Sequence, residues 1–245
     1  MSGQPFRLLN AGGRSPMVLI CDHASNRMPS GYGDLGLPEA ERRRHIAWDI
    51  GAAAICELLA ARFDAPAILS EVSRLVVDCN RHFNDASLTP AISDGTPVPA
   101  NHNLSADERR RRWEHFHQPY HQAIEDAIVR KFAGKQEPIV VSIHSMTPVM
   151  KGIARPWQIA MCWQEDERLS RPMLDALRAH GGIVVGDNEP YSLDRNEDYS
   201  VPVHAMGRGL KHLQVEFRQD EVAEPDGQRR WATIFGDCLK VALGV

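Results

Sequence analysis

The sequence predicts a three-layer α/β/α sandwich built on a mixed, mostly parallel central sheet. Short apolar runs alternate along the chain with longer segments in which apolar residues recur at helical spacing, and this alternation is typical of strands joined by helices. Residues 138–143 (PIVVSI) are the clearest central strand, and residues 16–21 (PMVLIC) form a continuous apolar run, which indicates a strand buried on both faces. No linker or repeat divides the 245 residues, so we expect a single domain over residues 1–245.

The remaining elements follow from the same two periodicities. A helix is predicted over residues 39–63, where apolar residues recur at four-residue steps: Ile46, Ile50, Ala54 and Leu58. Ser105, with Glu108 three positions later, predicts the start of another helix, and Pro119 should divide that helix into two pieces. Further helices are expected at residues 165–179 and 228–243, and further strands at 67–69, 75–77, 158–162, 183–185 and 212–217.

Composition excludes several classes of protein. Charged residues make up 24% of the chain and the net charge is −4, so neither a nucleic acid nor a membrane is an expected partner. The longest apolar runs are far shorter than a membrane-spanning helix, and the first residues lack the basic start and apolar core of a secretory signal. The five cysteines form no CxxC pair, which indicates reduced thiols and a cytoplasmic location.

Polar residues cluster directly after four of the predicted strands. The clusters are DHASN at residues 22–26, DCNR at residues 78–81, His144 with Ser145, and Glu216 with Arg218. Ligands of parallel α/β sheets bind beyond the carboxyl ends of the strands. We therefore expect the four clusters to converge on one site.

Two histidines in these clusters, His23 and His144, are candidate metal ligands. A catalytic zinc keeps three protein ligands and an open position for water, so a third ligand is required. Asp49, on the first predicted helix, is the first choice because a carboxylate partly neutralises the metal, and Asn26 and Asp22 are the alternatives. Asp22 has a second interpretation, as the partner that orients a histidine ligand. The competing hypothesis is that both histidines are hydrogen-bonded core residues.

Glu216 is the candidate catalytic base. It follows the apolar stretch Leu213-Gln214-Val215, where it could take a proton from a metal-activated water and pass it to the leaving nitrogen. The alternative is an ion pair with Arg218, because residues two positions apart share one face of a strand.

Arg81 and Asn80 are the candidate clamp for a substrate carboxylate. A guanidinium binds a carboxylate through two parallel hydrogen bonds, and a neighbouring amide can add a third. Arg74 and Arg218 are expected to support the same carboxylate. The alternative for Arg74 and Arg81 is a structural ion pair with a nearby aspartate such as Asp78. The predicted partner is thus a small molecule that bears a carboxylate.

Six stretches of the sequence resemble the N-formylglutamate amidohydrolase family. They occur in the family's order and are VLICDHASNRMP (18–29), HIAWDIGA (45–52), SRLVVDCNR (73–81), IHSMTP (143–148), GDNEPYS (186–192) and VEFRQD (215–220). The resemblance implies a fold similar to that of the zinc carboxypeptidases and aspartoacylases. It also implies metal-dependent hydrolysis of an N-acyl acidic amino acid, with zinc as the expected metal. N-formyl-L-glutamate, an intermediate of histidine degradation that would yield formate and glutamate, is the leading substrate.

The resemblance extends to individual positions. His23 and His144 match the ligand histidines of the wider group, Glu216 its late catalytic glutamate, and Asn80 with Arg81 its substrate clamp. Two departures indicate a divergent branch: Asn26 stands where the group has a ligand glutamate, and residues 22–25 (DHAS) replace a Pro-His-Ser-Gly type motif. The alternatives are a deacylase or carboxypeptidase acting on another N-acyl amino acid or peptide, and a non-catalytic protein that binds an acidic metabolite.

Overall fold

The computed structural model describes residues 4–244. A seven-stranded sheet runs through it in the order β1-β3-β2-β6-β11-β9-β10. The strands are β1 (Phe6–Leu9), β2 (Met17–Cys21), β3 (Ala67–Ser70), β6 (Ile139–Met146), β9 (Ile159–Cys162), β10 (Val185–Asp187) and β11 (Lys211–Arg218). Strands β3, β2, β6 and β11 are parallel, whereas β1 pairs antiparallel with β3 and β9 antiparallel with β11. The expectation of a mixed, mostly parallel sheet is confirmed.

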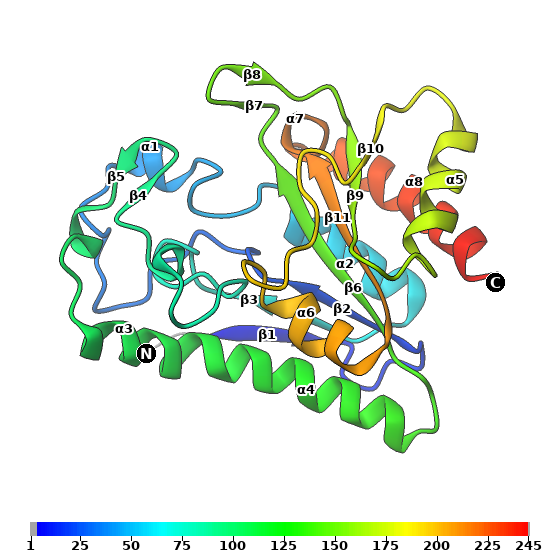
Figure 1. Ribbon diagram of the computed structural model, residues 1–245, viewed down its shortest axis with the longest axis horizontal. Coiled ribbons are helices and arrows are strands. Elements are labelled where there is room, and N and C mark those ends of the chain that lie inside the picture. Colours follow the sequence, from blue (N-terminus) through cyan, green and yellow to red (C-terminus); the bar gives the residue numbers. More distant parts are fainter. Residues whose placement is uncertain (1–3, 245) are drawn as a thin grey trace.

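Helices cover both faces of the sheet (Figure 1). Helices α2 (Ala52–Phe63), α5 (Ser170–His180) and α8 (Pro225–Leu243) pack on one face, and α4 (Gln118–Ala133) and α6 (Ser200–His204) on the other. Successive side chains of a strand point to opposite faces, so Leu19 and Cys21 of β2 contact the first group while Val18 and Ile20 contact the second. This two-sided burial explains the uninterrupted apolar run from which β2 was predicted.

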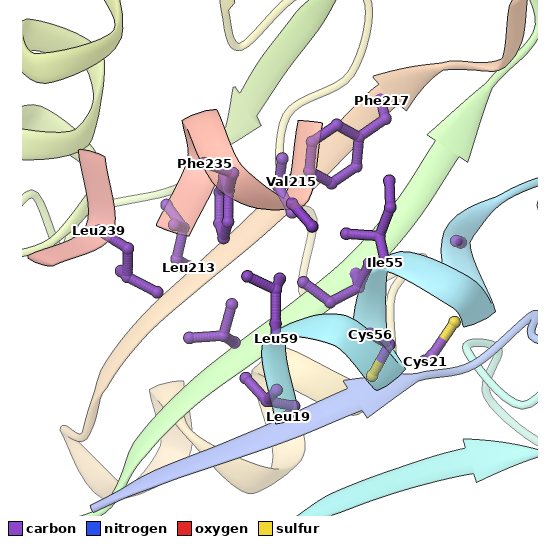
Figure 2. Packing of buried hydrophobic residues seen from close by; sticks show 14 of the residues in the cluster. Leu19, Cys21, Ile55, Cys56, Leu59, Leu213, Val215, Phe217, Phe235 and Leu239 are labelled. Carbon is purple, nitrogen blue, oxygen red and sulfur yellow. The ribbon is translucent and has the colours of Figure 1, made fainter. Parts of the chain in front are cut away.

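The larger apolar core lies between the sheet and helices α2, α5 and α8. Figure 2 shows Ile55 and Leu59 of α2 pointing at the sheet, and Phe235 and Leu239 of α8 in the same layer. Each such side chain contributes roughly 1.5–3 kcal/mol on burial.

All five cysteines are free and buried, in agreement with the reduced thiols that were predicted. No helix within residues 4–244 has both the length and the apolar character needed to cross a membrane.

The helix predicted over residues 39–63 is wrong in its first half. The chain forms a short α1 (Glu39–Arg42), then a series of turns, and only then α2. Gly51 precedes α2 with a φ of 83°, and a Cβ atom there would lie 2.2 Å from the carbonyl oxygen of Val222, so this approach requires glycine. Ile46 packs in a separate apolar cluster, whereas Leu58 is 37% exposed. The apolar residues at four-residue steps therefore do not form one buried helix face.

The strand predicted at residues 75–77 is also wrong, because this segment forms a turn. Its side chains are buried against Leu35 and Val98 from neighbouring loops, so its apolar character reflects loop packing. The adjoining irregular region, residues 89–103, contains the hairpin of β4 (Ile92–Ser93) and β5 (Thr96–Pro97) and the 3-10 turn Pro99–Asn101.

The helix predicted after Ser105 is confirmed, but a π-helical turn, and not a break at Pro119, divides it. The Glu108 amide donates a hydrogen bond to Ser105 Oγ over 3.1 Å at the start of α3 (Ala106–Arg112), and a π-helical turn (Trp113–His117) then separates α3 from α4. Pro119 lies in the first turn of α4, directly after the π-helical turn. The other predicted helices and strands correspond to α5, α8, β3, β9, β10 and β11, with boundaries shifted by up to five residues.

Candidate active site

Side chains from the carboxyl edge of the parallel strands line one cavity. His23 follows β2, His144 lies near the end of β6, and Glu216 lies near the end of β11. The parallel register of β6 and β11 places Glu216 beside His144. Together with Asp49 these residues line a cavity of about 340 Å³. The structure thus brings members of all four predicted clusters to one cavity, although residues 78–81 follow a turn and not a strand.

His23, Asp49 and His144 present one donor atom each to a common point. The Nδ1 atoms of His23 and His144 lie 3.4 Å and 2.9 Å from Asp49 Oδ2, and the three donor atoms lie within 4.8 Å of one another. Ligand atoms of a tetrahedral zinc, with bonds of about 2.0–2.1 Å, stand roughly 3.4 Å apart. The donor types and their spacing therefore fit a divalent metal, and residues 4–244 contain no second group of this kind.

Backbone contacts, and not a helix, position Asp49. Its amide donates to the His23 carbonyl over 2.9 Å, and its Oδ2 accepts from the Ser145 amide over 3.2 Å. The turns that replace the first half of the predicted helix therefore hold Asp49 against the ends of β2 and β6.

The outer nitrogen of each imidazole is held by a second group. His23 Nε2 lies 2.7 Å from Asp78 Oδ1. His144 Nε2 lies 3.0 Å from Ser142 Oγ and 3.2 Å from Asp22 Oδ2. A carboxylate behind an imidazole keeps a proton on Nε2 and turns the Nδ1 lone pair toward the metal position. The position of Asp22 beside His144 Nε2 is compatible with its second interpretation, as a partner that orients a histidine ligand.

Charge in this cluster controls the protonation of its members. Burial opposes the ionisation of Asp22, but hydrogen bonding and charge from His144 prevail and lower its pKa to about 2. Burial likewise disfavours a charged His144, yet its hydrogen bonds to Asp22 and Asp49 raise its pKa well above the usual value. An imidazole between two carboxylates thus retains both protons, and a bound metal would replace the one on Nδ1.

Glu216 is a buried carboxyl group on the cavity wall. Within residues 4–244 its Oε2 finds no hydrogen-bond partner. Burial, reinforced by the negative charge of Asp49 and opposed by nearby cations, raises the pKa of Glu216 to about 7. A pKa near neutrality suits a group that must accept and return a proton.

The predicted clamp residues lie on the cavity wall but already have partners. Arg81 Nη1 and Asn80 Nδ2 both donate to Asp198 Oδ1, over 3.2 Å and 3.0 Å. Arg74 binds Asp78 Oδ2 over 2.7 Å, which is the ion pair weighed as its alternative. Binding of a substrate by these residues stays a prediction.

The candidate metal ligand Asn26 and the candidate substrate contact Arg218 do not line the cavity. Asn26 Nδ2 donates to the Arg42 carbonyl over 3.0 Å, so its amide is engaged away from the donor set. Arg218 pairs with Asp220 and Glu221, and the ion pair with Glu216 that the strand spacing suggested is not formed.

Sequence reasoning missed several residues of the cavity wall, among them Arg155, Tyr191 and Asp198. Tyr191 belongs to the GDNEPYS stretch at residues 186–192, so the resemblance pointed to its loop without giving it a role. Arg155 and Asp198 follow no motif, and only the folded chain brings them to the site.

Fold and site together define the class of protein. A doubly covered, mostly parallel sheet carries a His-Asp-His donor set and, in Glu216, a buried carboxyl group of raised pKa at the carboxyl edge of its strands. This combination suits metal-assisted hydrolysis.

Comparison with known proteins gives the family. The model of the N-formylglutamate amidohydrolase family matches residues 15–223, and the chain belongs to this family, whose members are hydrolases acting on amides. A gene product of Agrobacterium tumefaciens has 32% sequence identity and a TM-score of 0.95, over 99% of this chain and 96% of that one. An N-formylglutamate amidohydrolase from Ralstonia eutropha has 19% identity and a TM-score of 0.76, over 99% and 98%, and so shares the fold. A search of curated proteins found no match.

Proposed function

We propose that the chain is a metal-dependent amidohydrolase that cleaves the amide bond of a small N-acyl acidic amino acid. N-formyl-L-glutamate is the leading substrate, and its hydrolysis adds water across the C–N bond to give formate and glutamate. One observation carries the proposal: the Nδ1 atoms of His23 and His144 converge with Asp49 Oδ2 beside the unpartnered carboxylate of Glu216. Family membership supplies the reaction class.

His23, Asp49 and His144 would hold the metal. When bound there, a divalent cation such as zinc polarises the amide carbonyl and acidifies a water molecule. The Asp78 and Asp22 carboxylates behind the two imidazoles fix the ring orientations. Asp49 is favoured over Asn26 as third ligand because Asp49 lines the cavity with both histidines, whereas Asn26 lies outside the lining with its Nδ2 bound to the Arg42 carbonyl.

Glu216 would act as the general base and then as the general acid. Its Oε2, free of any hydrogen-bond partner in residues 4–244, would accept a proton from the attacking water. The same proton would then pass to the leaving nitrogen as the C–N bond breaks. The raised pKa of Glu216, about 7, suits both transfers.

The cavity favours a small acyl group. Its volume is about 340 Å³, and Tyr191 and Ser192 of the 186–192 loop form part of the wall. This volume is at the low end of small-molecule sites, which fits a formyl or acetyl group better than a peptide.

We retain Arg81, Asn80 and Arg74 as candidate contacts of the substrate. The five unpaired cysteines support the expected cytoplasmic location.

The test combines metal content with formate release from N-formyl-L-glutamate. The purified protein should contain about one metal per chain, lose activity on chelation and regain it on addition of zinc, cobalt or manganese. His23→Ala should abolish both metal binding and activity. The exposed Arg14→Ala, whose side chain is 92% accessible, should change neither and serves as the control.

Three outcomes would change the proposal. Metal without formate release would keep the site and move the search to other N-acyl amino acids. Formate release that survives chelation would remove the metal from the reaction. Absence of both, after metal has been added, would favour the non-catalytic binding protein.

A further inference from the structure

Arg155 is a buried cation without a counter-charge. It directly follows the hairpin of β7 (Val149–Met150) and β8 (Ile153–Ala154), which rises above the sheet in Figure 1, and it lines the same cavity as His144 and Glu216. Its exposed fraction is only 8%. Among residues 4–244 no carboxylate forms an ion pair with it, and its side-chain hydrogen bonds go to neutral oxygens.

Neutral groups hold this guanidinium in place. Nη2 donates to the Tyr191 hydroxyl over 2.6 Å, Nη1 lies 3.4 Å from the Thr147 carbonyl, and the guanidinium carbon lies 4.8 Å from the centre of the Tyr191 ring. The backbone of Arg155 is bound on both sides, by the Pro148 carbonyl at 2.8 Å and by Arg218 Nη1 at 3.1 Å. The side chain is therefore oriented while its charge is left uncompensated.

The other lysine and arginine side chains of the cavity wall are either paired with a carboxylate or exposed to solvent. Arg74 is paired with Asp78, and Arg81 with Asp198. Lys151 also lines the cavity but is exposed to solvent. Burial of an unpaired charge is expensive, so a buried Arg155 that faces a cavity calls for an anionic ligand.

We propose that Arg155, oriented by Tyr191, binds a carboxylate of the substrate and thereby makes the enzyme specific for acidic N-acyl amino acids. This inference rests on the proposed function, because it concerns the substrate of the same cavity. A guanidinium held by neutral groups is free to make two parallel hydrogen bonds to a carboxylate. Arg81 and Asn80, whose polar atoms already bind Asp198, would then anchor the loop that carries Asp198.

The test compares acids with their amides in matched variants. Arg155→Met removes the charge and keeps an apolar stem, Arg155→Lys keeps the charge and loses the planar fork, and Arg81→Met removes the rival cation. Each is assayed with N-formyl-L-glutamate, with its side-chain amide and with its α-amide. Truncating one partner of a buried charge pair should lower kcat/KM for the diacid about 30-fold to 1,000-fold, mainly through KM. For the amide that lacks the carboxylate bound by Arg155, kcat/KM should be nearly the same in Arg155→Met as in the wild type. Arg155→Lys should have an intermediate kcat/KM for the diacid.

A binding measurement separates this inference from the proposed reaction. The affinity of glutarate, an unreactive dicarboxylate, and of its monoamide is measured by calorimetry on the wild-type protein and on Arg155→Met, with Arg14→Met as a charge-matched control. The wild-type protein should bind glutarate at least about 10-fold more tightly than the monoamide, and Arg155→Met should bind the two equally. This result would support the inference even if formate release fails.

The inference would be overturned by either of two results. Arg155→Met and Arg155→Lys, with unchanged thermal midpoints, could lose activity equally on acid and amides, which shows a structural role. Alternatively, both could keep the preference for the acid while Arg81→Met loses it, which makes Arg81 the anchor.

Discussion

Replacement of Glu216 by glutamine should inactivate the enzyme and stabilise its metal-free form. The substitution keeps the shape of the side chain and removes its titration. In the metal-free protein the Glu216 carboxyl is buried, and its Oε2 has no hydrogen-bond partner within residues 4–244. Ionisation at this position therefore opposes folding, whereas a neutral amide carries no such penalty.

The pKa of Glu216 sets the magnitude. Burial, with the nearby Asp49 charge, raises it from the ordinary 4.5 to about 7, and one pKa unit corresponds to about 1.4 kcal/mol. Below pH 4.5 the carboxyl is protonated in both the folded and the unfolded chain. Between pH 4.5 and 7 the unfolded chain releases its proton while the folded chain keeps it, so the wild type loses stability. Above pH 7 the wild type should be about 3 kcal/mol less stable than Glu216→Gln.

The assay is urea denaturation of both proteins in the presence of a chelator, from pH 4 to pH 8.5. The difference in free energy of unfolding should grow through the interval from pH 4.5 to 7 and then become constant. The same variant, loaded with metal, should release formate about 10²–10⁴-fold more slowly. Stability and activity should thus move in opposite directions, as expected for a group retained for catalysis.

Parallel pH profiles for the two proteins would refute the electrostatic argument. A variant that is less stable than the wild type at every pH would instead give Glu216 a structural role. Full activity in Glu216→Gln would remove it from the reaction altogether.

Two further predictions concern the groups around the site. Asp78→Asn should weaken metal affinity by about 10–100-fold, because Asp78 orients His23 through its Nε2; competition with a coloured chelator measures this, and unchanged affinity would show that the carboxylate is dispensable. Burial lowers the pKa of His117 to about 3, so the unfolded chain binds a proton first as the pH falls below 6.5. The wild type should therefore lose about 2 kcal/mol at this position between pH 7 and pH 5, and His117→Gln should show that much less acid sensitivity in urea midpoints; equal sensitivity would contradict the assignment.

The sheet was predictable because its central strands are buried on both faces. The run that became β2 is apolar throughout, and the run predicted for β6 at residues 138–143 has Ser142 as its one polar residue. Short runs of this kind between turn signals are typical of strands buried on both faces. The secondary-structure prediction failed where apolar residues are buried between loops. Leu75, Val76 and Val77 are buried against other loops, and periodicity cannot distinguish that environment from a strand.

The site was predictable by chemistry more than by local structure. Asp49 was selected for its charge and placed on a helix, yet the structure holds it in the turns before α2 by a bond to the His23 backbone. Arg81 and Asn80 had the right chemistry for a carboxylate, but their partner Asp198 lies more than a hundred residues away in the sequence. Arg155 had no signal, because its decisive property is the absence of a counter-charge among residues 4–244, and that property exists only after folding.

The cavity contains two buried groups of opposite charge that do not neutralise each other. Glu216 lacks a hydrogen-bond partner for Oε2, and Arg155 contacts neutral oxygens only, within the part of the chain described. Stability alone would favour a direct ion pair or apolar replacements. Their separation leaves a carboxylate-binding group and a proton-transfer group free in one small volume, where a substrate that has both an acid and an amide can satisfy the two at once. The unfavourable burial of Arg155 is then offset when the substrate binds, so its removal should raise KM for the acid without destabilising the free protein.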